Sequence, residues 1–259
     1  SGPLVNGSAT NNLTKSGPGN LTLAAANTHS GTNRISGGML TLAHSGALQN
    51  STLDMNAADS GILRFSGITA ASLGGLTGTR PITLANLSNA PVTLSFGGSG
   101  LNQTYSGVFT GPGSIIKTGS GTATLAALNT FTGTTRVNGG VLALGNGFTL
   151  QNSTLDLNGS DSGRISFGNY ATANLGGLMG SGNLWLTNGI GAPLTLNVGG
   201  NGQDTAFAGV LAGSGHLHKT GLGQLVLSGA NTYSGNTIIS GGTLALSRDP
   251  IVKFTFDSV

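Results

Sequence analysis

The chain has 259 residues, of which only 7% are charged, and its formal net charge at pH 7 is +3. Ordinary soluble domains are about one quarter charged residues, so this surface is expected to be polar but almost uncharged. The ten Lys and Arg residues are scattered and form no basic stripe, which argues against nucleic-acid binding. Cysteine is absent, which excludes disulfides, thiol catalysis and Cys-based zinc sites.

The remaining composition indicates a thin but real core. Hydrophobic residues make up 37% of the chain, too many for a disordered linker, and there are 47 glycines. All seven acidic residues are Asp. The chain opens on Ser1-Gly2-Pro3-Leu4, which has no signal-peptide pattern, so we expect it to be a piece of a longer protein.

Three similar blocks follow one another at a constant spacing. They begin at Lys15, Lys117 and Lys219, and 117 − 15 and 219 − 117 both equal 102. The segments between the blocks also recur. These are 47–61 with 149–163, 72–78 with 174–180, and 90–98 with 192–200. The unit is therefore a 102-residue superrepeat, present about two and a half times.

Within each superrepeat, short runs alternate apolar and polar residues. Leu21-Thr22-Leu23 and Leu40-Thr41-Leu42 have the period of two that is typical of a strand with one buried face. Gly-Gly, Asn-Gly and Ser-Gly pairs between the runs supply tight corners and exclude long helices. Leu23 and Leu42 lie 19 residues apart, which predicts coils of about 20 residues and about five coils per superrepeat. We therefore predict an all-β fold, a parallel β-solenoid of about 12 coils over residues 1–247.

The third block contains every part of a recognisable sequence motif. It reads KTGLG at 219–223, LVLSGANTYSG at 225–235 and GGTLAL at 241–246. This pattern resembles the autotransporter-associated β-strand repeat of bacterial passenger domains, and the resemblance covers residues 1 to about 247. It implies a right-handed β-helix that is exported through the outer membrane and exposed at the cell surface, where such passengers serve as stalks or adhesins.

The last residues depart from this pattern. After Leu246 the chain continues as SRDP and then IVKFTFDSV, in which Val252, Phe254 and Phe256 alternate with polar residues. Residues 248–259 are therefore interpreted either as a cap on the solenoid or as the first strand of a following domain. We favour the second interpretation slightly.

The repeated charged residues favour structural roles. Asp54 and Asp59 recur as Asp156 and Asp161, and a residue that repeats in register is more typical of a turn than of a unique catalytic group. The repeated Lys15, Lys117 and Lys219 are expected on an outward face. No nucleophile elbow, P-loop or carboxylate cluster is evident, so we predict no catalytic residues, no cofactor and no enzyme activity.

Two patterns suggest metal binding. Residues 199–207 match a calcium-binding nonapeptide, which makes Asp204 a calcium candidate. The aligned segment 97–105 has Asn102 at that place and no tandem copy follows, so a chance match is favoured. His216 and His218 share one strand face, but a third ligand is not evident. His29 aligns with Phe131 and Tyr233 and is expected to pack as an aromatic.

Trp185 is the candidate ligand-binding residue. It is the only tryptophan and alternates with Leu184 and Leu186, so it faces away from them. If the leucines point inward, the indole is exposed and could stack on a glycan or a partner. Packing against an adjacent coil is the alternative, and we favour it.

Three functions remain after these exclusions. The first is a non-catalytic stalk or adhesin scaffold of a secreted or surface-exposed passenger, with a host or neighbouring cell surface, or a glycan, as partner. The second is a carbohydrate-binding or carbohydrate-cleaving β-helix. The third is a self-assembling fibre element that associates end to end through its flat terminal coils. The first is favoured, with no nucleic-acid partner and no insertion of this segment into a membrane.

Overall fold

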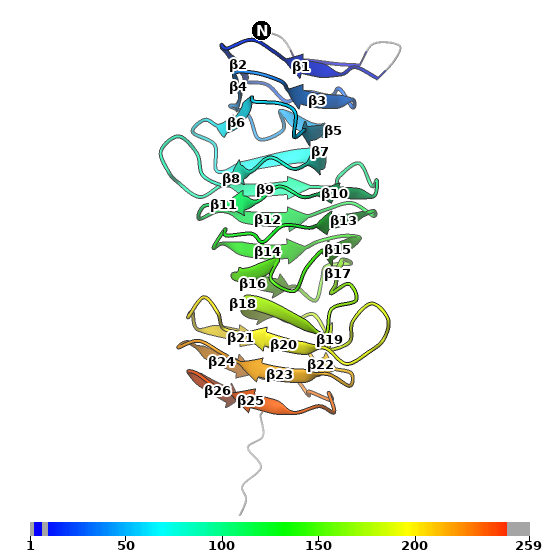
Figure 1. The fold of residues 1–259 in the computed structure, drawn as a ribbon, viewed down its shortest axis with the longest axis vertical. Helices are drawn as coiled ribbons and strands as arrows, with labels where there is room; N and C mark the ends of the chain where they lie inside the picture. The colour runs from blue at the N-terminus through cyan, green and yellow to red at the C-terminus, as the bar shows by residue number, and fades with distance from the viewer. Residues whose placement is uncertain (1–2, 7–9, 248–259) are drawn as a thin grey trace, which may run out of the picture.

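The computed structural model describes residues 3–6 and 10–247, and the predicted C-terminal cap or domain start at 248–259 lies outside these residues. The described part is an all-β rod without helices, a β-solenoid of about 11 turns (Figure 1). It contains no helix that is long and apolar enough to cross a membrane. The predicted fold class is confirmed, while its right hand stays a prediction.

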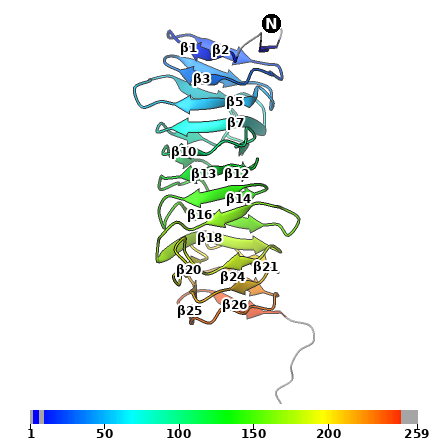
Figure 2. The same ribbon diagram turned by 90° about the vertical axis from the view of Figure 1, so that its right-hand side faces the viewer.

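Each coil runs along three sides of the rod, and coils stack through parallel ladders (Figures 1 and 2). The ladder that starts at the first block contains β1 (Leu13–Lys15), β3 (Thr32–Ile35), β5 (Leu48–Met55), β7 (Ala70–Gly78), β10 (Gln103–Tyr105), β13 (Thr122–Leu125), β15 (Val141–Leu144) and β17 (Arg164–Ser166). The ladder through the second block contains β9 (Thr93–Phe96), β12 (Ser114–Lys117), β14 (Thr134–Val137), β16 (Leu150–Leu157), β18 (Thr172–Gly180), β21 (Thr205–Phe207), β24 (Gln224–Leu227) and β26 (Thr243–Leu246).

The remaining strands form shorter ladders. They are β2 (Asn20–Leu23), β4 (Met39–Leu42), β6 (Ile62–Phe65), β8 (Ile82–Thr83), β11 (Phe109–Thr110), β19 (Leu184–Trp185), β20 (Thr195–Val198), β22 (Leu211–Ala212), β23 (His216–Lys219) and β25 (Thr237–Ile239). β5, β7, β16 and β18 are long enough to turn a corner, so each of them takes part in two ladders.

The core is a continuous column inside the coils. In β12, β14 and β20 every second side chain is buried, as the period of two predicts. Midway along the rod, Tyr105 and Phe109 have ring centroids 4.8 Å apart, and Phe109 meets Phe131 edge to face at 6.0 Å. Because no coil could bury its apolar face alone, stacking supplies most of the stabilisation.

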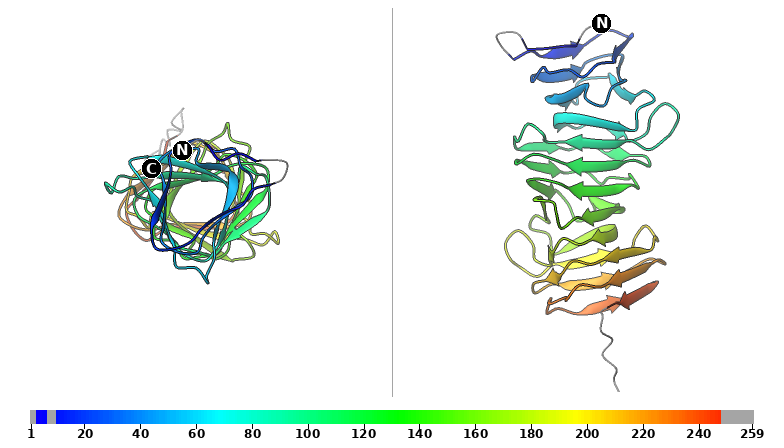
Figure 3. Two further views of the ribbon diagram at one scale, coloured as in Figure 1. Left: turned by 90° about the horizontal axis from the view of Figure 1, so that it is seen from above. Right: turned by 180° about the vertical axis from the view of Figure 1, so that it is seen from behind.

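Coil length is not uniform, which lowers the number of turns. Along the first ladder the coil from Arg34 to its partner Asp54 has the predicted length. The next two coils are longer, because Met55 pairs with Gly78 and Gly78 pairs with Tyr105. The longer coils contain loops that bulge from the rod (Figure 3, right). Fewer turns therefore form than a solenoid of constant coil length would contain.

The superrepeat is not a whole number of coils. The ladder from Lys15 reaches Leu125 after five coils, and Leu125 lies well beyond Lys117, where the next superrepeat begins. Lys117 therefore lies one side earlier, in a ladder with Phe96. Lys219 lies on the remaining side, in a ladder with Val198. Equivalent positions thus lie on three different sides of the rod, which is drawn from above in Figure 3 (left).

Candidate functional site

The three repeated lysines close corners of the coils from the inside. All three are buried, and the Nζ of Lys117 donates to the carbonyl oxygens of Thr118, Gly119 and Gly139 at 2.5, 3.0 and 3.1 Å. The Nζ atoms of Lys15 and Lys219 make the equivalent three bonds. An ammonium group has three donors, so each is satisfied without an acidic partner.

The expectation that these lysines face outward is therefore wrong. Lys117 is in phase with the inward Ile115 on β12, so the alternation had already placed it inside. Gly38, Gly140 and Gly242 complete the corners with φ values of 66°, 65° and 63°. A Cβ at Gly38 would stand 2.7 Å from the Nζ of Lys15, so glycine is required there by both backbone conformation and space. Burial lowers the pKa of Lys117 and of Lys219.

A second repeated contact was not anticipated from the sequence. The buried Asn129 accepts a hydrogen bond from the Phe109 amide at 2.9 Å and donates one to the carbonyl of Thr149 at 3.1 Å, so it links three successive coils. Asn27 bonds Leu4 and Ala47 in the same way, and Asn231 accepts from the Leu211 amide. The Asn-Thr pair that recurs in every block was the available signal.

The repeated Arg and Asp residues form ion pairs. Arg34 binds Asp59 through Nε and Nη2 at 2.7 and 2.8 Å, and Arg136 binds Asp161 through the same atoms at 2.6 and 2.8 Å. The hydrogen bond from Arg34 lowers the pKa of Asp59. Burial raises the pKa of Asp156, which lies near this second pair. The interpretation of the repeated acids as structural residues fits these contacts.

Asp204 acts as a link between neighbouring coils. Its Oδ1 accepts the backbone N–H of Gln224 at 2.7 Å, and the aligned Asn102 accepts the N–H of Thr122 at 2.8 Å. An amide serves as well as a carboxylate here, so the contact does not require a negative charge. Among residues 3–6 and 10–247, no three His, Cys, Asp or Glu side chains gather as a metal site.

The histidines also link coils. On β23, His216 and His218 both point outward; Nδ1 of His216 receives the Asn236 N–H at 2.9 Å, and His218 lies between Asn197 and Ser240. His29 is buried and bonds Asn33 at 2.7 Å, so it does take the place of an aromatic side chain in the core. Its Nδ1 is the one buried side-chain nitrogen or oxygen without a partner among the described residues.

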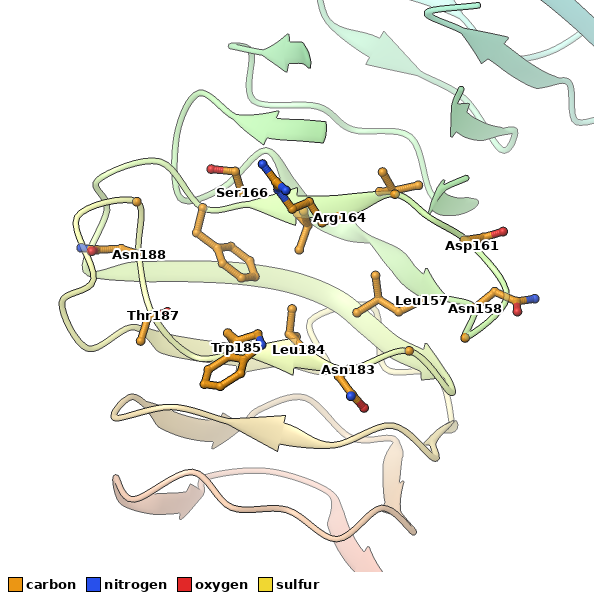
Figure 4. Close-up of a pocket in the computed structure, with 17 residues that line it drawn as sticks. Leu157, Asn158, Asp161, Arg164, Ser166, Asn183, Leu184, Trp185, Thr187 and Asn188 are labelled. Carbon is orange, nitrogen blue, oxygen red and sulfur yellow. The ribbon is translucent and has the colours of Figure 1, made fainter. Parts of the chain in front are cut away.

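Trp185 lies at the edge of a cleft. Its neighbours Leu184 and Leu186 are buried while the indole is 64% exposed, so the predicted alternation is confirmed and the favoured packing interpretation is wrong. The cleft has a volume of about 370 Å³ and runs between the loop at 158–163, β17 and the segment 182–189. In Figure 4, Asn158 and Asp161 lie on one side of it and Thr187 and Asn188 on the other. We call this cleft the Trp185 groove.

The Trp185 groove contains no nucleophile–base pair. Its floor is apolar, with Leu157 and Phe167, and its polar groups are amides, backbone carbonyls, the hydroxyls of Ser166 and Thr187, Arg164 and the ion-paired Asp161. This composition suits binding of a ligand with a few polar groups rather than acid–base chemistry. Whether Trp185 itself contacts a ligand stays a prediction.

Comparison with known proteins identifies the blocks. The family description Passenger-associated-transport-repeat matches residues 13–42, 115–144 and 217–246. These ranges contain the three blocks that begin at Lys15, Lys117 and Lys219, which we call the Lys-led blocks. The protein Adhesin BmaC autotransporter of Brucella suis biovar 1 (strain 1330) is 36% identical over 243 residues, covering 88% of this chain. The chain spans only 7% of the length of that relative. No solved structure matches the chain.

Proposed function

We propose that this chain, which belongs to the autotransporter passengers built on the passenger-associated transport repeat, is a non-catalytic rod. The rod holds adhesive surface at a distance from the cell and displays it there. The family places the segment outside the cell or on its surface. Since the chain corresponds to a small part of its relative, adhesion is proposed for the whole protein, and this segment contributes length and surface to it.

The observation that supports this proposal is that the repeated charged side chains bind other parts of the rod. Each repeated lysine and each Arg–Asp pair is occupied by contacts that hold neighbouring coils together. The groups that remain exposed in the Trp185 groove are suited to contact, not to turnover. A rod built in this way can be lengthened by superrepeats, because each unit contacts only its neighbours.

Two measurements test the proposal. Beads coated with the purified chain should attach to cultured cells more than beads coated with a helical protein of similar charge. In parallel, incubation with bacterial and plant polysaccharides should yield no product detectable by mass. Cleavage that is lost on Asp156→Asn substitution would overturn the non-catalytic assignment, and attachment no greater than that of the control beads would contradict adhesion.

Length can be tested separately. Duplicating residues 15–116 should give a folded, longer rod, because the one new junction, between residue 116 and residue 15, reproduces a native block boundary. The added length should be about 22 Å at roughly 4.8 Å per coil, measured by small-angle scattering. A chain that aggregates or keeps its original length would contradict the modular rod.

A further inference from the structure

The two full superrepeats differ at the Trp185 groove. In the first superrepeat the space equivalent to this groove contains the side chain of Arg80. Its Nε donates to the carbonyl of Asn56 at 2.8 Å and its Nη2 to that of Ile35 at 3.2 Å, and Nη1 donates to the carbonyl of Gly61. Three backbone carbonyls from two coils thus surround one guanidinium group.

The residue 102 positions after Arg80 is Gly182, which has no side chain to fill that space. The three carbonyl-bearing residues correspond to Val137, Asn158 and Gly163, and all three line the Trp185 groove together with Gly182. The open groove is therefore the guanidinium site of the first superrepeat with its occupant removed.

The Trp185 groove also has fewer neighbouring positive charges than the Arg80 site of the first superrepeat. In the first superrepeat Arg34 and Arg80 lie near Asp54 and Asp59. In the second, Arg136 lies near Asp156 and Asp161, and Asp161 lines the groove. Replacing an arginine by glycine leaves a carboxylate without its second neighbouring cation, so a cation entering the groove is favoured electrostatically.

Arg164 is the one basic residue that lines the groove. It occupies the place of Ile62 at the start of β17. In Figure 4 its side chain lies on the rim beside Ser166 and away from Asn158 and Asp161. The carbonyl end of the groove is therefore open to an outside group.

We propose that the Trp185 groove binds the guanidinium group of an arginine side chain from a partner polypeptide, with Trp185 contacting a residue beside that arginine. Trp185 follows Gly182 by three residues, about 10 Å along an extended segment, which suits contact with a neighbouring residue of the same peptide. Arginine fits better than lysine because the corresponding carbonyls of the first superrepeat are bound by three different nitrogens of one planar group, Nε, Nη1 and Nη2 of Arg80, whereas a lysine has a single nitrogen. The proposal goes beyond the rod function and does not depend on it.

The decisive test uses the unaltered 259-residue chain. Acetyl-Ser-Arg-Gly-Ser-amide is titrated against it, with binding followed by calorimetry and by the fluorescence of Trp185, the only tryptophan. The same peptide with citrulline has nearly the same shape but no charge, and a lysine version changes the donor geometry. We expect saturable binding of the arginine peptide and affinity at least about tenfold lower for both analogues.

Matched variants locate the site. Gly182→Arg should abolish binding, because it restores the occupant of the first superrepeat; a Cβ at Gly182 meets its nearest neighbour, the carbonyl oxygen of Leu157, at 3.2 Å. Arg80→Gly should open a second site and raise the stoichiometry from one to two. Arg164→Ile, which copies the first superrepeat, should increase the affinity, because it removes a positive charge from the lining of the groove.

Several outcomes would overturn the proposal. They are equal affinity for the citrulline peptide, no binding of the arginine peptide at millimolar concentration, and unchanged affinity in a folded Gly182→Arg variant. Preferential binding of a neutral oligosaccharide by the unaltered chain would also reject it. The citrulline comparison needs no substitution in the protein, so it decides even if a variant fails to fold. Cell attachment is scored separately, so failure here leaves the rod function standing.

Discussion

The Lys-led coils and the coils between them follow different rules. In the Lys-led coils the same contacts recur in all three copies, although the copies face three sides of the rod. In the coils between them, some equivalent positions change partners. Arg80 and Tyr105 of the first superrepeat become Gly182 and Phe207 of the second, and a filled space becomes a groove. Corners that close a coil tolerate little change, whereas bulging coils can vary without breaking the stack.

The difference between the two kinds of coil has a physical cause. A buried ammonium group or amide must find partners within its own coil pair, because an unsatisfied buried polar group costs about 1–3 kcal/mol. A side chain on a bulging coil can be replaced by solvent or by a partner. The following substitutions test this difference.

Lys117→Met is expected to have the largest effect. It keeps the length of the side chain but leaves three carbonyls without donors, which should lower the free energy of unfolding by about 3 kcal/mol. Urea titration followed by far-UV circular dichroism measures this loss. The control is Arg64→Met on an exposed face of β6, for which a change below about 0.5 kcal/mol is expected. Equal effects of the two substitutions would contradict the corner role.

Asn129→Ala should rank second. It leaves the Phe109 amide and the Thr149 carbonyl unpaired in the interior, at a cost of about 2 kcal/mol. Asn231→Ala provides the matched comparison, because Asn231 has the same role but lies half-buried near the end of the described rod. We expect a smaller midpoint shift for Asn231→Ala in the same denaturation experiment. A larger shift at Asn231 would show that linking coils is not what Asn129 contributes.

Tyr105→Phe should cost only about 1 kcal/mol, the net worth of one hydrogen bond, because Phe207 already occupies the equivalent place. Its phenol donates to the carbonyl of Arg80 at 2.7 Å, and burial raises the pKa of Tyr105 above its ordinary value of 10.0. A raised pKa means that the folded state favours the neutral phenol. Its contribution is therefore complete below pH 10 and declines above it. Thermal melts from pH 7 to 11 should show the two proteins converging, and parallel curves would contradict this.

Asp59→Asn should have the smallest effect at neutral pH, since its partner Arg34 is partly exposed and solvent weakens the pair. The pKa of Asp59 is lowered in the fold, so the pair stabilises the protein above the ordinary Asp pKa of 3.8 and is lost as pH falls below it. The midpoint difference between Asp59→Asn and the unaltered chain should therefore shrink as the pH falls below 3.8. A difference that persists there would assign the effect to packing instead of charge.

Much of the architecture was predictable from local patterns. Alternation in segments such as 92–94 and glycine-rich corners predicted the strands, and the spacing of the Lys-led blocks predicted the superrepeat. The outward direction of Trp185 also followed from alternation, although packing against an adjacent coil was favoured over the exposure that the structure shows. The burial of the lysines was missed because a charge was expected to outweigh the period of two. In fact the backbone carbonyls at the corner, such as those of Gly119 and Gly139, accept the hydrogen bonds of the buried Lys117 ammonium group.

By itself, the sequence determined the repeating unit, the strand character and the inward phase of the apolar residues, because each depends on neighbours within a few positions. Only the tertiary structure decided how the coils add up. Because two of the coils are long, five complete turns contain more residues than one superrepeat. Each superrepeat therefore begins one side of the rod earlier than the superrepeat before it. It also decided that Gly182 faces the carbonyls equivalent to those that hold Arg80 in the first superrepeat. Residues such as Gly182 and Val137 are far apart in the chain, and only stacking brings them to one groove.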